Sequence, residues 1–166
     1  KWGSVGSNDG QFNTPCDIAV DGQGRVLVVD SCNHRVQVFT AEGNFLAKWG
    51  TEGDASRQQM PSGIGVGADG KIFVTDPSVS GHHVQVFASD GTFPAGGVQG
   101  KADGQFEHPN GIAVDAQGRV VIADMGNHRV QVFSADGNFL AKWGSSGSSD
   151  GQFKSPRRGG GFPRQD

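Results

Sequence analysis

Short apolar runs recur along the chain, and glycine-rich polar residues separate each run from the next. The runs are rich in β-branched and aromatic residues, a composition typical of strands. In the first fifty residues they predict four strands, labelled a to d: Ile18–Val20, Arg25–Val29, Arg35–Phe39 and Phe45–Trp49. The a–b and c–d connections contain Gly and Asn, which adopt a positive φ at low cost, so we expect tight hairpin turns there. Strand b is apolar at consecutive positions, which predicts burial of both its faces.

This pattern repeats along the chain. Prolines spaced by 46, 48 and 47 residues open successive units: Pro15, Pro61, Pro109 and Pro156. A period of this length with four strands in each unit is typical of β-propeller blades. An open β-sandwich is the alternative, but it gives no reason for the same turn residues to recur at a fixed period. The predicted fold class is therefore all-β, with three blades of four antiparallel strands.

The repeat also predicts the organisation of the chain. We expect blades at 15–50, 61–97 and 109–144, with the second blade divergent. Before them, 1–14 should hold the end of a preceding blade and a link, because Lys1-Trp2-Gly3 matches the end of strand d. After them, 145–156 should begin a fourth blade and 157–166 should form a disordered tail, since it lacks apolar periodicity.

One tract of the repeat resembles a known family. Asn33-His34-Arg35-Val36-Gln37-Val38-Phe39 recurs unchanged as Asn127–Phe133, with Pro-x-x-Ile-x-Val upstream and an Asp at the end of strand b. The tract resembles the NHL repeat, named for Asn-His-Leu, although Arg stands at the third position here. The resemblance implies a six-bladed ring, of which three blades are about half. Either the chain is an excerpt of a longer one, or two copies complete the ring. The second unit departs from the pattern, with Gly81-His82-His83 in place of Asn-His-Arg and no Trp in strand d.

Composition and charge restrict the function classes. Hydrophobic residues make up 34% of the chain, which also holds 28 glycines, so a thick helical core is not expected. The net charge of -3 argues against a globally basic nucleic-acid binder, and no apolar run approaches the roughly 20 residues that span a membrane. Cys16 and Cys32 are too few for a disulfide scaffold, which favours reduced thiols and weakly a cytoplasmic location.

The b–c loops and the d–a links between blades lie at one end of an up-and-down blade, and they are longer than the turns at the other end. Binding residues concentrate on loops of a rigid scaffold, so this b–c/d–a end is the expected ligand-binding face. Its candidate residues are Asn33, His34, Arg35, His82, His83, Asn127, His128 and Arg129. The aspartates that end strand b, with an Arg five residues later in two of the units, are expected to be structural: Asp30, Asp76 and Asp124.

The sequence favours neither a metal site nor a catalytic site. His34, His82 and His128 recur, and three His can bind zinc. Each belongs to a different blade, however, and neighbouring sheets are separated by about 10 Å, so they should not converge. The chain has no Tyr and no Ser/His/Asp spacing that stands out from the repeat. We therefore expect no catalytic residues and no cofactor.

These observations favour a non-catalytic protein- or peptide-binding scaffold. The resemblance implies target recognition of the kind found in tripartite-motif ubiquitin ligases. Single-stranded RNA binding by the same face is the first alternative, since some NHL propellers resemble RNA readers, but the acidic links offset the Arg residues. A metal-dependent lyase or lactonase on a related propeller is the second. A membrane partner is not expected.

Overall fold

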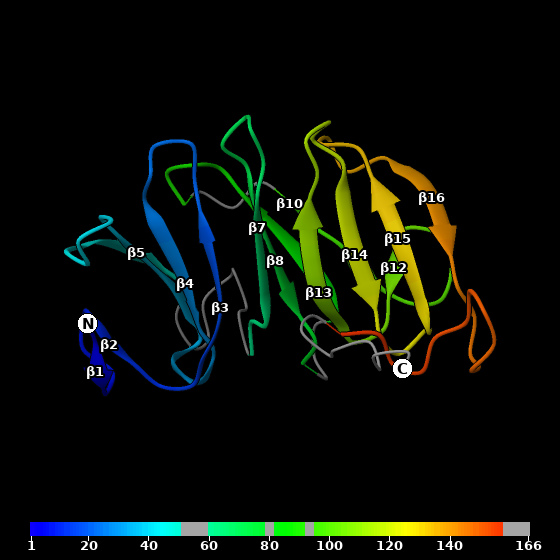
Figure 1. The fold of residues 1–166 in the computed structure, drawn as a ribbon, viewed down its shortest axis with the longest axis horizontal. Coiled ribbons are helices and arrows are strands. Elements are labelled where there is room, and N and C mark those ends of the chain that lie inside the picture. Colours follow the sequence, from blue (N-terminus) through cyan, green and yellow to red (C-terminus); the bar gives the residue numbers. More distant parts are fainter. Residues whose placement is uncertain (51–59, 79–81, 92–94, 158–166) are drawn as a thin grey trace, which may run out of the picture.

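The chain folds as a row of three four-stranded antiparallel sheets in a computed structural model, which describes residues 1–50, 60–78, 82–91 and 95–157 (Figure 1). Blade 1 consists of β3 (Pro15–Val20), β4 (Val26–Asp30), β5 (Arg35–Phe39) and β6 (Phe45–Trp49). Blade 2 consists of β7 (Gly63–Val66), β8 (Ile72–Asp76), β9 (His83–Phe87) and β10 (Ala95–Gly96). Blade 3 consists of β13 (Pro109–Val114), β14 (Val120–Asp124), β15 (Arg129–Phe133) and β16 (Phe139–Trp143). The predicted all-β class and its four-stranded antiparallel blades are confirmed.

Short parallel pairs of strands lie in the links. β1 (Ser4–Val5) pairs with β2 (Gln11–Phe12), and β11 (Val98–Gln99) pairs with β12 (Gln105–Phe106). The 3-10 turn η1 (Ser31–Asn33) joins β4 to β5. None of the described helices is long and apolar enough to cross a membrane.

The hairpin turns follow from local sequence. The Asp21 carboxylate accepts hydrogen bonds from the backbone N–H groups of Gln23 and Arg25, both at 2.9 Å, and Gly24 has a φ of 76°. An aspartate that bonds its own backbone two residues on is a common turn device. At the other hairpin of blade 1, Gly43 has a φ of 90°. These contacts fix the turn and therefore the register of the strands around it.

Each blade packs face to face on the next, with the innermost strands β3, β7 and β13 side by side (Figure 1). Buried apolar residues of blades 1 and 2 form one core: Leu27, Val29, Val36, Val38, Ile64, Ile72, Val74 and Phe87. A second core joins blades 2 and 3: Phe73, Val84, Phe106, Ile112, Val120, Ile122 and Phe133. Alternate residues of β8 enter the two cores, so both faces of this strand are buried. In β4, the strand for which burial of both faces was predicted, the consecutive residues Leu27, Val28 and Val29 are all buried.

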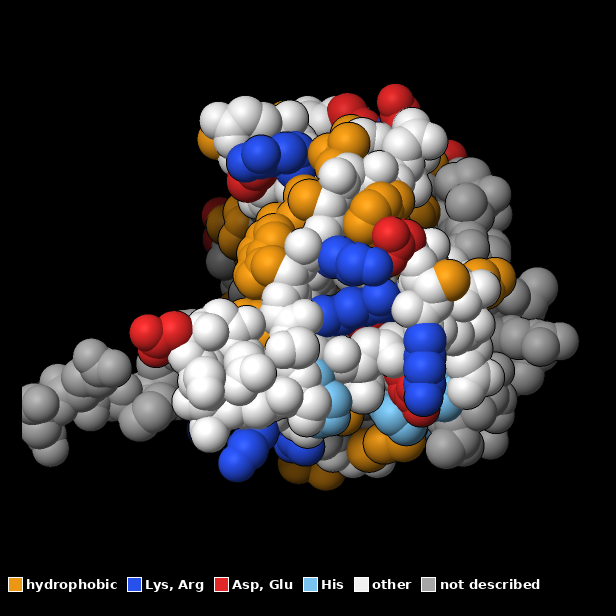
Figure 2. All heavy atoms as spheres, turned by 90° about the vertical axis from the view of Figure 1, so that its right-hand side faces the viewer, with side chains coloured by type: hydrophobic (Ala, Val, Ile, Leu, Met, Phe, Trp, Pro, Cys, Tyr) orange, Lys and Arg blue, Asp and Glu red, His pale blue; other side chains and the backbone are white. Residues whose placement is uncertain are grey.

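The two outer faces of the row carry exposed apolar side chains. On blade 1, Ile18 is 53% exposed and Val20 is 62% exposed, whereas Ile64, at the position of Ile18, is 2% exposed in blade 2. On the opposite face, Trp143 of blade 3 is exposed, and Figure 2 shows hydrophobic side chains along this end of the molecule. The half-ring and the boundaries of the six expected segments stay predictions. The tail expected at 157–166 lies outside the described residues except for Arg157.

Candidate functional site

The predicted ligand-binding face is built from the turns that follow the second strand of each blade. A histidine in each turn adopts the left-handed conformation, with φ values of 55° at His34, 42° at His82 and 53° at His128. This conformation reverses the chain in a short space, and apart from Gly it is adopted mostly by Asn, Asp and His. The three residues are equivalent in the repeat, so the left-handed position is a constant part of the blade.

In blade 1 a buried carboxylate organises this turn. Asp30 is fully buried and accepts four hydrogen bonds. Its donors are the Asn13 backbone N–H at 2.7 Å, the Asn33 amide at 2.8 Å, the Arg35 Nε at 2.8 Å and the Gln37 amide at 3.0 Å. A buried charge of this kind is tolerated when it is paired and hydrogen-bonded. The Asp30–Arg35 ion pair that the five-residue spacing suggested is present.

The same side chains also hold the link that enters blade 1. Arg35 donates from Nη1 to the Ser7 carbonyl and from Nη2 to the carbonyls of Asn8 and Gln11, each at 2.9 Å. The Gln37 side chain donates to the Gln11 carbonyl at 2.7 Å and accepts from the Gly10 N–H at 2.9 Å. We call this network of Asp30, Asn33, Arg35 and Gln37 the aspartate clamp. It replaces water at backbone groups that would otherwise be buried without partners.

Blade 3 repeats the clamp with the same geometry. Asp124 is fully buried and accepts from Asn127 at 2.9 Å, Arg129 at 2.7 Å and Gln131 at 3.1 Å. Arg129 donates to three link carbonyls at 2.8–2.9 Å, those of Lys101, Ala102 and Gln105. An arrangement reproduced this closely in two blades is part of the repeat itself.

Blade 2 lacks the arginine, and a histidine pair lies beside its turn. Asp76 accepts from the Ser78 N–H at 3.0 Å, and His83 stands where the other blades have Arg. The buried ring of His82 accepts a hydrogen bond at Nδ1 from the His108 N–H at 2.9 Å, and the two imidazole rings lie edge to face 4.1 Å apart. Burial, and then the neighbouring His108, lower the pKa of His82.

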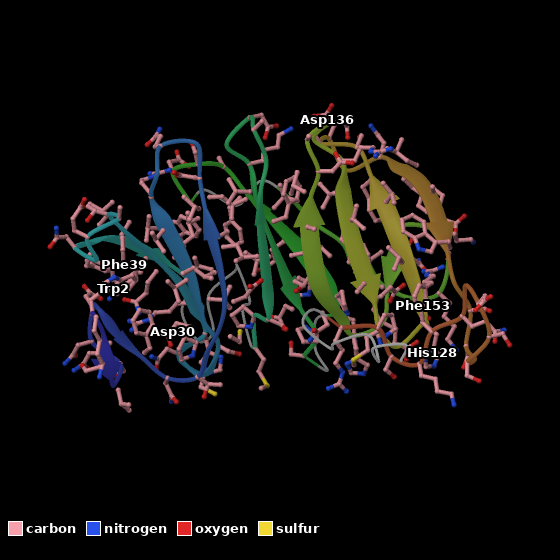
Figure 3. All side chains as sticks on the ribbon, viewed as in Figure 1. Trp2, Asp30, Phe39, His128, Asp136 and Phe153 are labelled. Carbon is pink, nitrogen blue, oxygen red and sulfur yellow. The ribbon has the colours of Figure 1, made fainter. Side chains whose placement is uncertain are left out.

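The candidate residues therefore fall into two groups. In four of the candidate residues the side-chain N–H groups donate to oxygen atoms of the chain itself: Asn33, Arg35, Asn127 and Arg129. His34, His83 and His128 are half-buried, whereas His82 is buried. Figure 3 shows Asp30 and His128 at the same end of the molecule, with Asp136 at the opposite end. Contact of this face with a ligand stays a prediction.

Two members of the clamp were missed by the sequence reasoning. Gln37 and Gln131 are fully buried, and each bridges the carboxylate to a link carbonyl. A signal was available, because Gln is the one neutral polar residue in the otherwise apolar Val-Gln-Val-Phe run. Buried amides are expected to be hydrogen-bonded.

The described part of the chain holds no group of three or more His, Cys, Asp or Glu side chains placed to bind a metal ion. His34, His82 and His128 belong to different blades, as their repeat positions required. The hydrogen bonds at this face fix the backbone position of the turns and links in blades 1 and 3.

Comparison with known proteins decides the family. The model of the NHL repeat matches residues 12–39, 59–87 and 106–133, which together make up about half of the chain. The chain belongs to the NHL-repeat family. Each matched segment of this NHL-repeat chain runs from the link through the third strand of a blade, so each includes the turn that the clamp organises in blades 1 and 3.

Two curated relatives share parts of the NHL-repeat chain. It is 38% identical over 80 residues to protein brain tumor of Drosophila melanogaster, covering 47% of this chain and 8% of that protein. It is 51% identical over 43 residues to the human E3 ubiquitin-protein ligase TRIM32, covering 26% of this chain and 7% of the ligase. The chain thus spans less than a tenth of the length of either relative.

Solved structures agree on the fold. The RRP9 WD40 repeats match with a TM-score of 0.63 at 9% identity, over 80% of this chain and 39% of that one. Virginiamycin B lyase from Staphylococcus aureus matches with a TM-score of 0.58 at 14% identity, over 76% of this chain and 40% of the lyase. At these identities the likeness shows the fold alone.

Proposed function

We propose that this NHL-repeat chain is a non-catalytic scaffold whose b–c/d–a end recognises a protein or peptide partner. The observation that carries the proposal is the aspartate clamp, which fixes the turn and the link at this end in blades 1 and 3. Backbone groups held in this way form a rigid surface, which lowers the entropic cost of binding.

The charges at this end favour a protein partner over RNA. The guanidinium groups of Arg35 and Arg129 are buried against carboxylates and carbonyls, so they present little positive charge to solvent. Lys48 is paired with Asp9 at 2.5 Å, and the net charge of the chain is -3. Single-stranded RNA binding needs an accessible positive groove and stacking platforms. We therefore propose a protein partner, and the crosslinking experiment below includes RNA binding as an alternative result.

The wider role follows from the relatives. One of them is named as an E3 ubiquitin-protein ligase, so we propose target recognition within a ubiquitin-ligase-type protein. The exposed apolar faces of blades 1 and 3 fit completion of the ring by further blades or by a second copy. A lyase activity is supported only by the similarity of the fold to that of virginiamycin B lyase.

Site-directed photocrosslinking in cells would test which end of the blades contacts a partner. A photoreactive residue replaces Cys32 in the b–c turn or Met60 in the link, both of them exposed. The matched controls carry it at Gln23 or Gln117, exposed residues of the turns at the opposite end. RNase and protease treatment then separates RNA adducts from protein adducts.

Protein adducts at positions 32 and 60 that are absent at positions 23 and 117 would support the proposal. RNase-sensitive adducts at the first two positions would replace the protein partner with RNA. Adducts from the control positions alone would refute the assignment of the binding end.

A further inference from the structure

A tryptophan ring packs on a phenylalanine of the following blade at two places. The ring of Trp2 lies 4.7 Å from Phe39 of blade 1 (Figure 3), and the ring of Trp49 lies 5.8 Å from Phe87 of blade 2. Trp49 belongs to β6, so its ring fills the space between blades 1 and 2, and Trp2 lies at the equivalent position before blade 1. We call the space that receives such a ring a tryptophan socket. Equivalent walls recur between blades 2 and 3.

Glycines at the c–d turns show how full each socket is. A Cβ atom placed on Gly43 would lie 2.3 Å from the Trp2 ring, and one on Gly91 would lie 2.2 Å from the Trp49 ring. On Gly137, the equivalent residue of blade 3, it would meet no described atom within 4 Å. All three glycines have a φ between 83° and 90°, so the turns themselves are alike. Among the described residues, therefore, no ring fills the third socket, which we call open.

The sequence explains why this socket is open. Trp49 pairs with Val36, and the equivalent position opposite Val84 is taken by Gly97, whose N–H bonds the Val84 carbonyl at 2.8 Å. Glycine has no side chain to place between the blades. The second repeat thus lacks the tryptophan side chain that would fill the space between blades 2 and 3.

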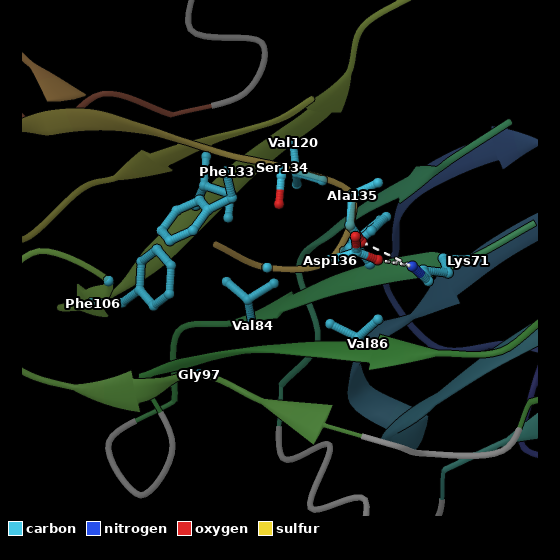
Figure 4. A pocket seen from close by; sticks show the side chains of 14 residues that line it. Lys71, Val84, Val86, Gly97, Phe106, Val120, Phe133, Ser134, Ala135 and Asp136 are labelled. Atoms are coloured by element: carbon cyan, nitrogen blue, oxygen red, sulfur yellow. Dashed lines mark hydrogen bonds and ion pairs between the residues drawn. The ribbon is translucent and has the colours of Figure 1, made fainter. Parts of the chain in front are cut away.

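The walls of the open socket have kept their geometry. In blade 3, Phe106 and Phe133 lie 5.5 Å apart at 43°, and in blade 1, where the socket is filled, Phe12 and Phe39 lie 5.6 Å apart at 45°. The rings remain in place because strands held by their own sheets carry them. A cavity of about 340 Å³, open to solvent on one side, results (Figure 4).

The side chains that line this cavity indicate which kind of ligand would bind there. Apolar side chains from both blades form its walls, among them Phe73, Val84, Phe106, Ile122 and Phe133. Figure 4 shows the Lys71–Asp136 ion pair at one end, with a distance of 2.8 Å. An apolar cavity of about 150 Å³ already takes up benzene, and aromatic rings favour tilted or offset contacts with each other. The space, its apolar walls and its three phenylalanines suit a neutral planar ring.

We propose that the open tryptophan socket between blades 2 and 3 is a binding site for an aromatic ring of indole size. The ring can belong to a small molecule or to a tryptophan side chain of a partner peptide. Lys71 and Asp136, at one end of the site, belong to turns opposite the b–c/d–a end, whereas Gly97 and Gly104 of its lining belong to the d–a link. The site therefore lies in the body of the junction between the blades, and the proposed protein-binding face is formed by the turns and links at one end of it.

Titration of the intact protein with indole, followed by NMR, would test the site. We expect saturable binding at millimolar indole or below, with the largest shifts at the ring signals of Phe106 and Phe133. A short soluble peptide with one tryptophan, and the same peptide with alanine, would separate a side-chain ligand from a free one. Binding of indole alone assigns a small-molecule site, and tryptophan-dependent binding of the peptide assigns a partner side chain.

Two variants fill the socket from within the chain. Gly97→Trp restores the ring present at Trp49, and Val86→Trp fills the cavity from the neighbouring strand. Gly97 does not have a left-handed φ, and an added Cβ would meet the Phe106 ring at 2.9 Å, so this ring must shift. Either folded variant should lower the affinity for indole at least tenfold, because the added ring occupies the space that indole would take.

Absence of binding by the folded protein at millimolar indole would overturn the proposal, as would unchanged binding in a folded filled variant. Crosslinking at positions 32 and 60 should persist in Gly97→Trp. A failure of the proposed protein-binding face is thereby distinguishable from a failure of the socket.

Discussion

Removal of the buried arginine from the clamp gives the sharpest test of the structure. Arg35 uses four of its five N–H donors, one on Asp30 and three on backbone carbonyls of the link. Arg35→Ala leaves a fully buried carboxylate without its cation. Breaking a buried ion pair by removing one partner costs about 3–5 kcal/mol. We expect about 3 kcal/mol, since Asn13, Asn33 and Gln37 still donate to Asp30.

The matched control is an arginine at the other end of the same blade. Arg25 pairs with Asp21 at 2.6 Å, but its side chain is 28% exposed, and Asp21 keeps two backbone donors when the guanidinium is lost. Partly exposed pairs contribute about 0–1 kcal/mol. Arg25→Ala should therefore cost at most about 1 kcal/mol.

Urea unfolding followed by tryptophan fluorescence measures both changes. With a slope of about 2 kcal/mol per molar urea, Arg35→Ala should lower the midpoint by about 1.5 M and Arg25→Ala by about 0.5 M or less. The double variant with Asp30→Ala should show a coupling of about 1–3 kcal/mol. Equal shifts for Arg35→Ala and Arg25→Ala would refute the clamp as the main support of this end.

Three further changes test other parts of the fold by the same measurement. Trp49→Ala should cost about 3–5 kcal/mol, because it empties a filled socket; a loss below about 1 kcal/mol would contradict the packing. Burial and the neighbouring His108 lower the pKa of His82 from 6.5, so the neutral imidazole stabilises the fold fully above pH 6.5. Below pH 6.5 this stability is lost, by at most about 1.4 kcal/mol per pH unit. His82→Gln should remove that part of the pH dependence of the unfolding free energy between pH 7.5 and 5.5, and an unchanged slope would contradict the role of His82. Gly43→Ala should cost about 1–3 kcal/mol more than Gly137→Ala, because both have a positive φ but only Gly43 faces a tryptophan ring; equal costs would mean that the two sockets are equally open.

The sequence was sufficient for the parts of the fold that local chemistry decides. Strands such as Arg35–Phe39 and Phe45–Trp49 have the predicted bounds, because turn residues on either side set where a strand begins and ends. The Asp30–Arg35 pair was also within reach, since five residues across a tight turn bring the two side chains together. The candidate binding face was inferred from the up-and-down order of the strands alone, because that order places the b–c loops and the d–a links at the same end of each blade.

The partners of those residues were decided by tertiary structure alone. Arg35 and Gln37 bond backbone carbonyls that lie 24 to 28 residues earlier, and no local pattern states where a distant link will pass. Arg35 therefore looked like a candidate for ligand contact, whereas its donors are bonded inside the fold. The absence of tryptophan from the second blade was visible in the sequence. That Phe106 and Phe133 would keep their spacing around an open socket depends on sheets that fix their backbones independently, and only the packed structure contains that information.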